Sequence, residues 1–164
     1  MTGEAIAFYL MAAVMLASGV VVVTSSNIVH SAVALVPVFL GVTGLYILLN
    51  AEFVAGVQVL IYAGAITVLI LFVIMLTQGG TGLRFPERNE QGPIGFAVAV
   101  ALGAMLAVGV THTAWGRGAG TLPAYTAGAI GQSFLGPNLL LFEGTSLVLL
   151  VSLIGAIIIA RKEE

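Results

Sequence analysis

The strongest constraint on the fold is the absence of Asp, Glu, Lys and Arg from residue 5 to residue 51. A soluble domain carries roughly a quarter of its residues as charged side chains, but here charged residues are 7% of the chain and hydrophobic residues are 60%. In lipid, only helices and closed barrels satisfy the backbone hydrogen-bonding groups, and a run of about 20 apolar residues is long enough for one helical crossing. The sequence therefore predicts an all-α, polytopic membrane protein.

Five apolar runs define the expected spans, in a single integral membrane domain covering residues 1–164. An odd number of spans places the two termini on opposite sides of the membrane. Basic residues are retained on the cytoplasmic side, and four of the five lie on the side of the carboxy terminus, with only Arg117 on the other. We therefore expect the C-terminus in the cytoplasm, with the N-terminus and segment 113–137 outside, or toward the lumen in an organelle or thylakoid. The default assignment is a multi-pass protein of the bacterial inner (plasma) membrane, and the charges do not decide between these membranes. The predicted helices lie near 4–24, 29–49, 53–77, 94–112 and 138–160, and the four basic residues are Arg84, Arg88, Arg161 and Lys162.

The same composition argues against several function classes. No basic cluster suits a phosphate backbone, so nucleic acid is not expected as a partner. The chain has no cysteine, and its two histidines, His30 and His112, are far apart in sequence, so we assign no catalytic, cofactor-binding or metal-binding residue. No titratable residue falls at mid-membrane depth, and the five spans show no inverted repeat. An independent pump or transporter is therefore disfavoured.

The third run is the most informative, because residues 53–77 would form a straight helix of about 37 Å, longer than the hydrocarbon core of roughly 30 Å. Gln58 and Tyr62 are four residues apart and are expected to share one helix face. Ala63 and Gly64 follow with almost no side-chain bulk, which favours a bulge or hinge there. A purely structural reading also fits, in which Tyr62 bonds to an adjacent helix and Gly64 permits close packing.

Other residues in the spans carry simpler expectations. Gly41 and Gly44 are predicted to let two helices approach closely. Pro37 removes one backbone hydrogen bond inside the second span and should kink that helix. Glu52 and Glu143 are expected at the outer interface as interfacial carboxylates, solvated or near helix ends.

Two segments resemble a known family. Residues 58–76, QVLIYAGAITVLILFVIML, and residues 142–161, FEGTSLVLLVSLIGAIIIAR, are similar to the J subunit of the proton-pumping NADH:quinone oxidoreductase, respiratory complex I. The same family includes the mitochondrial subunit called ND-six and its counterpart in the photosynthetic form of the complex. Both segments occur in the expected order, and the number of spans agrees.

The resemblance implies a membrane-arm subunit of a proton-translocating enzyme of the respiratory electron-transport chain, without redox chemistry of its own. It also implies a π-bulge in the third helix at Tyr62, Ala63 and Gly64, so these residues and Gln58 are candidates for a gate that couples quinone reduction to proton translocation. FMN, iron–sulfur clusters and quinone would be held by other subunits. The implied partners are the other membrane-arm subunits, especially the small carboxylate-bearing subunit and the quinone-site subunit, within the lipid bilayer.

Some relatives have Glu where this chain has Gln58, and an amide cannot titrate, which argues against direct proton transfer at this position. An alternative function remains open, namely a small membrane subunit of a related cation/proton antiporter or membrane-bound hydrogenase. Neighbouring genes for quinone-site and NADH-binding subunits would favour complex I over that alternative.

Overall fold

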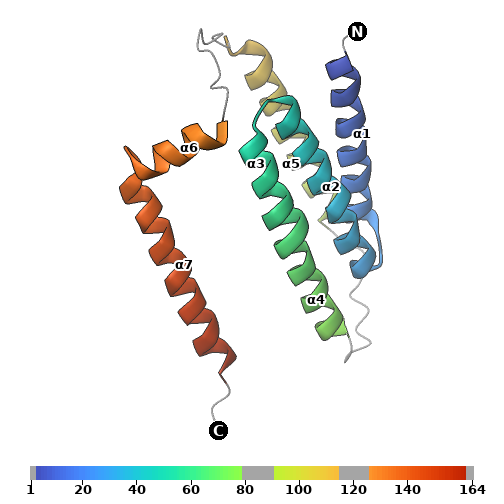
Figure 1. Cartoon of the computed structure of the whole chain (residues 1–164). Coiled ribbons are helices and arrows are strands. Elements are labelled where there is room, and N and C mark those ends of the chain that lie inside the picture. The colour runs from blue at the N-terminus through green and yellow to red at the C-terminus, as the bar shows by residue number, and fades with distance from the viewer. Residues whose placement is uncertain (1–2, 79–90, 115–125, 162–164) are drawn as a thin grey trace.

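The computed structural model describes residues 3–78, 91–114 and 126–161, and the secondary structure in these ranges is helical. Five helices are long and apolar enough to cross a membrane, and the third of them joins α3, η1 and α4 into one continuous helix (Figure 1). The prediction of an all-α protein with five spans is therefore confirmed. The helices are α1 (Gly3–Thr24), α2 (Ile28–Leu48), α3 (Glu52–Val57), the π-helix η1 (Gln58–Ile66), α4 (Thr67–Gln78), α5 (Gly92–His112), α6 (Thr126–Leu135) and α7 (Leu139–Ala160).

Short connections fix the first three spans as antiparallel neighbours. Asn27 caps α2, because its side-chain oxygen accepts hydrogen bonds from the backbone N–H groups of Val29 and His30. Residues 49–51 then turn the chain from α2 into α3, with Asn50 in the left-handed region at φ 56°. The N–H of Ala51 donates to the carbonyl of Tyr46 at 2.9 Å and closes this turn.

The helices α1 and α2 pack side by side, and α2 in turn packs on α3, η1 and α4 (Figure 1). A Cβ atom at Gly41 would lie 3.0 Å from the Met15 Cβ and 3.2 Å from the Met11 carbonyl oxygen. A Cβ atom at Gly44 would lie 2.7 Å from the Met11 sulfur. Both glycines therefore lie at the contact between α1 and α2, as expected, and at Gly41 the close atoms belong to the Met11 backbone and the Met15 Cβ, which cannot easily move aside. Pro37 lies inside α2 as expected.

The small interior of the described structure contains more polar than apolar side chains. Ala32 and Ala55 are its buried hydrophobic residues, whereas Thr43, Gln58 and Thr67 are buried and polar. The large apolar side chains point outward on every span. This distribution suits a helix bundle in lipid. Lipid provides no hydrophobic drive between helices, so polar contacts and close packing hold the helices together.

The last spans stand apart from this bundle. In the described ranges, α5 makes no close backbone contact with another helix, and α7 packs only against α6. Segment 113–137 was expected to be a Gly-rich connection, but α6 forms within it, crosses the top of α7 and reaches α3 (Figure 1). Its half-buried positions Thr126, Ala129, Ile130 and Ser133 recur at helical spacing, a pattern that the glycines of this segment obscure in the sequence.

The first turn of α1 and the last turn of α7 lie at opposite ends of the molecule (Figure 1), as five spans require. The orientation itself rests on Arg84, Arg88, Arg117 and Lys162, and these four residues lie outside the described residues. The assignment of the C-terminus to the cytoplasm therefore stays a prediction.

Candidate functional site

The third span changes its hydrogen-bond register at its centre. From Gln58 to Ile66 the backbone forms a π-helix, with regular α-helix on either side. At the end of this stretch the N–H of Thr67 donates to the carbonyl of Tyr62, five residues earlier. The predicted bulge in the third helix is therefore confirmed, and it includes all four candidate residues, Gln58, Tyr62, Ala63 and Gly64.

A buried polar residue lies at each end of the π-helix, Gln58 as its first residue and Thr67 as the first residue of α4. Gln58 is 8% exposed and Thr67 is 1% exposed, and α2 is the helix that packs on both η1 and α4. Nine residues span about 2.5 turns of an α-helix, which would place these two side chains on opposite faces. The wider π turn removes that offset, since its hydrogen bonds join residues five apart.

Gln58 and Tyr62 differ in exposure although both lie in the π-helix. Gln58 is buried, whereas Tyr62 is 44% exposed and its ring lies against Phe39 of α2. The expectation that they share one helix face stays a prediction. Thr67, which sequence reasoning did not select, lies five residues after Tyr62 and is buried. The only sequence feature that could have indicated Thr67 is its spacing of nine residues from Gln58.

Gln58 is a largely buried polar residue of the π-helix. It is 8% exposed, and no side-chain hydrogen bond joins it to the residues that the structure describes. An amide in apolar surroundings costs free energy unless it is paired. The partial burial of Gln58 therefore carries a free-energy cost that no hydrogen bond within the described ranges offsets.

Tyr62 and Gly64 contact their surroundings in ways that depend on the register. The Tyr62 ring lies against the Phe39 ring of α2, with centroids 5.5 Å apart and planes inclined by 59°. A Cβ atom at Gly64 would lie 3.3 Å from the Val59 carbonyl oxygen, again five residues earlier. Glycine at position 64 therefore avoids a close contact that the Cβ atom of an alanine would make in the π-helix.

The two interfacial carboxylates lie on separate elements. Glu52 is the first residue of α3, where the positive end of the helix dipole favours a negative charge, and it lines a shallow groove with Thr43 and Val59. Glu143 lies one turn inside α7 and is exposed. Because α3 and α7 make no close backbone contact in the described ranges, the structure does not bring these carboxylates together.

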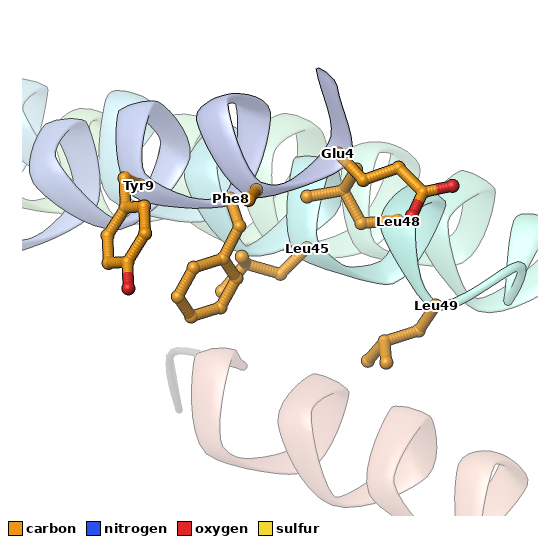
Figure 2. A pocket seen from close by; sticks show the side chains of 7 residues that line it. Glu4, Phe8, Tyr9, Leu45, Leu48 and Leu49 are labelled. Carbon is orange, nitrogen blue, oxygen red and sulfur yellow. The ribbon is translucent and has the colours of Figure 1, made fainter. Parts of the chain in front are cut away.

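A larger groove of about 500 Å³ lies between α1 and α2 near the start of α1. Figure 2 shows Phe8, Tyr9 and Leu49 pointing to the same side of these helices, with Glu4 at one end of the groove. Its lining is apolar apart from the Glu4 carboxylate and the Tyr9 hydroxyl. Among the described residues no group of three or more His, Asp or Glu side chains is placed to hold a metal ion.

Comparisons with known proteins agree with this architecture. Residues 18–159 match the family model described as NADH-ubiquinone/plastoquinone oxidoreductase chain 6. The chain is 41% identical to NAD(P)H-quinone oxidoreductase chain 6 of Synechocystis sp., over 96% of this chain and 81% of that protein. It is 37% identical to NADH-quinone oxidoreductase subunit J of Rhodobacter capsulatus, over 100% of this chain and 85% of that protein.

A further relative is named for a different electron donor. The chain is 39% identical to F(420)H(2) dehydrogenase subunit J of Methanosarcina mazei, over 98% of this chain and 92% of that protein. The match to the family model covers most of the chain, including the π-helix and nearly all of α7. The family indicated by segments 58–76 and 142–161 is thus confirmed, and the chain belongs to the NADH-ubiquinone/plastoquinone oxidoreductase chain 6 family.

Proposed function

We propose that this chain, a membrane-arm subunit of the NADH-quinone oxidoreductase complex, helps couple quinone reduction to proton translocation through the π-helix of its third span. The chain contributes no redox chemistry of its own. The single observation that supports this role is the register change from Gln58 to Ile66, inside a span whose one charged residue, Glu52, lies at its start.

A π-helix is suited to such a role because its extra residue can be absorbed or released. Returning the segment to α-helical pairing rotates one half of the helix relative to the other. The side chains on α4 would then face different neighbours, while α3 stayed on α2. Rotation of this kind can open or close a proton route that runs through neighbouring subunits, since Gln58 itself does not titrate.

The proposed partners follow from this role. A movable helix has to lie between the subunit that binds quinone and the small subunit that carries membrane-embedded carboxylates, with FMN and iron–sulfur clusters on other subunits. Three relatives named for NADH, NAD(P)H and F(420)H(2) are all about 40% identical to this chain, so this subunit does not select the electron donor. We place the chain, as a single membrane domain, in a bacterial plasma membrane with its C-terminus in the cytoplasm.

The test is Gly64→Ala in the assembled complex, in membrane vesicles. Alanine favours α-helix over glycine by about 1 kcal/mol and would press on the Val59 carbonyl oxygen, so the π-helix is weakened. The number of protons translocated per NADH oxidised should fall while the amount of assembled complex stays normal. The matched control is Gly56→Ala, on α3 of the same span, where a Cβ atom meets nothing within 4 Å. A Gly64→Ala complex that assembled and pumped as many protons per NADH as the wild type would refute the proposed role.

A further inference from the structure

The groove between α1 and α2 occupies only the end of the helix pair where α1 begins. Its lining comes from residues 4–9 of α1 and 45–49 of α2, and the α1 part rises about 7.5 Å along the helix. Just below it the helices are in contact, because a Cβ atom at Gly44 would lie 2.7 Å from the Met11 sulfur. The hydrocarbon core is about 30 Å thick, so the groove lies within one leaflet. A helix from a neighbouring subunit would follow α1 through both leaflets, whereas a lipid molecule occupies one.

The walls of the groove are apolar and are held in place by packing within the chain. On α1 the Phe8 ring meets the Tyr9 ring edge-on, with centroids 5.4 Å apart and planes inclined by 76°. Phe8 and Leu49 point to the same side of the helix pair (Figure 2), and they are 48% and 69% exposed. Both side chains therefore keep free surface for a further apolar group, and van der Waals packing is what holds such a group in lipid.

Glu4 places a carboxylate at one end of this groove. The helix α1 has 22 residues and is about 33 Å long, so its second residue lies where the hydrocarbon core of roughly 30 Å meets the lipid headgroups. Glu4 forms no ion pair with a residue that the structure describes, and the described arginine, Arg161, follows α7 at the opposite end of the molecule (Figure 1). A carboxylate at this depth is stabilised by a positive charge beside it. The groove thus offers apolar walls in the hydrocarbon and one negative charge at the level of the headgroups.

We propose that the groove binds a phospholipid with a primary-amine headgroup, such as phosphatidylethanolamine. The ammonium group donates to the Glu4 carboxylate, and one acyl chain lies along Phe8 and Leu49. A primary ammonium carries three N–H donors, as the lysine side chain does, and forms a charge-assisted hydrogen bond with a carboxylate. The quaternary ammonium of phosphatidylcholine has no N–H donor. Phosphatidylglycerol has a net negative charge, which Glu4 repels. The carboxylate therefore selects the headgroup, and the apolar walls hold the chain.

The experiment uses the assembled complex in nanodiscs with equal amounts of phosphatidylethanolamine, phosphatidylcholine and phosphatidylglycerol that carry the same acyl chains. Benzoyl-phenylalanine, which bonds covalently to nearby C–H groups on illumination, replaces Phe8, and mass spectrometry of this subunit identifies the attached molecule. Adducts with the ethanolamine lipid should exceed those with the choline lipid about threefold, the effect of one ion pair at an exposed site. Glu4→Gln should remove this preference, and Glu4→Lys should make phosphatidylglycerol the preferred lipid.

The matched control places the same probe at Ile6. This residue is 58% exposed on the same part of α1 but does not line the groove. Its adducts should follow the composition of the nanodisc, with or without Glu4→Gln. A preference at Phe8 that is absent at Ile6 then belongs to the groove and not to the lipid around the whole helix.

Three results would overturn the lipid site. An adduct between the probe at Phe8 and a peptide of another subunit means that protein covers the groove. Lipid adducts in the proportions of the nanodisc mean that the headgroup is not recognised. A preference for the ethanolamine lipid that survives Glu4→Gln means that the carboxylate does not select it. If the complex with the probe at Phe8 does not assemble, the probe replaces Leu49 on α2, and the same results decide.

Discussion

The π-helix in the third span and the last helix α7 are both apolar, yet they differ in backbone and in surroundings. The π-helix packs on α2, and the residues at its two ends, Gln58 and Thr67, are buried. The helix α7 is regular α-helix over its whole length, and its described residues are exposed in this chain except for the half-buried Gly155. Its hydroxyls donate to carbonyls three or four residues earlier, as Ser152 does to the Val148 carbonyl.

This difference shows where a membrane helix can depart from α geometry. Lipid offers no hydrogen bonds, so irregular backbone is tolerated only where protein covers it. Among the described helices outside the third span, α2 is the one that covers the π-helix. The helix α7 contacts only α6 in the described ranges and stays regular.

The largest effect is expected from Gly41→Leu. Even a Cβ atom at Gly41 contacts Met15 and the Met11 backbone, so leucine would separate α1 from α2 and lower the free energy of unfolding by about 3 kcal/mol. Gly155→Leu on α7 should change it by less than about 0.5 kcal/mol, because a Cβ atom there meets nothing within 4 Å. Unfolding of the full chain in mixed micelles measures both. Equal losses would show that α2 is no better packed than α7.

A smaller loss is expected at the turn between α2 and α3. Asn50→Ala puts a residue with a poor left-handed preference at φ 56° and should lower the free energy of unfolding by about 1 kcal/mol. Asn50→Gly should cost little, since glycine adopts this conformation readily. The same titration measures both variants. If alanine proved as stable as glycine, this turn would not constrain the third span.

Replacing the buried amide should stabilise the chain. Gln58→Leu removes a polar group that has no partner among the described residues, so the free energy of unfolding should rise by about 1 kcal/mol. Ser152→Leu on α7 removes an exposed hydroxyl already bonded within its helix, and should have almost no effect. Destabilisation by Gln58→Leu in the isolated chain would mean that the amide has a partner, such as a trapped water molecule.

The smallest effect concerns two aromatic pairs. Double-mutant cycles should give a coupling energy of about 1 kcal/mol for Phe39 with Tyr62, and a similar value for Phe134 with Phe142, where α6 meets α7. In a Gly64→Ala background the first coupling should disappear, because return of the segment to α-helical pairing moves Tyr62 away from Phe39. The second should persist. Persistence of both couplings would show that the alanine variant leaves the helix unrotated.

Much of the fold follows from the sequence because lipid imposes simple rules. Uncharged runs of sufficient length become spans, and Gly41 and Gly44 mark a close helix contact. The helix α6 escaped these rules. It is too short to span the membrane, and its glycines hide its helical spacing.

The sequence indicated where the candidate site lies but not which of its residues are neighbours in space. The small residues Ala63 and Gly64 indicated a bulge, and the π-helix is there. The burial of Thr67 could not be read from spacing, because the spacing rule assumes the α register that this segment abandons. A change of period inside a helix alters which residues are neighbours, and only the backbone pairing reveals it.

The tight turn at Asn50 has a mechanical consequence for the third span. The hydrogen bond from the Ala51 N–H to the Tyr46 carbonyl connects the start of α3 to the last turn of α2, so this end of the third span is held in place. If one end of a helix is held and its middle rotates, the other end has to move. A change of register between Gln58 and Ile66 would therefore be expressed as rotation of α4.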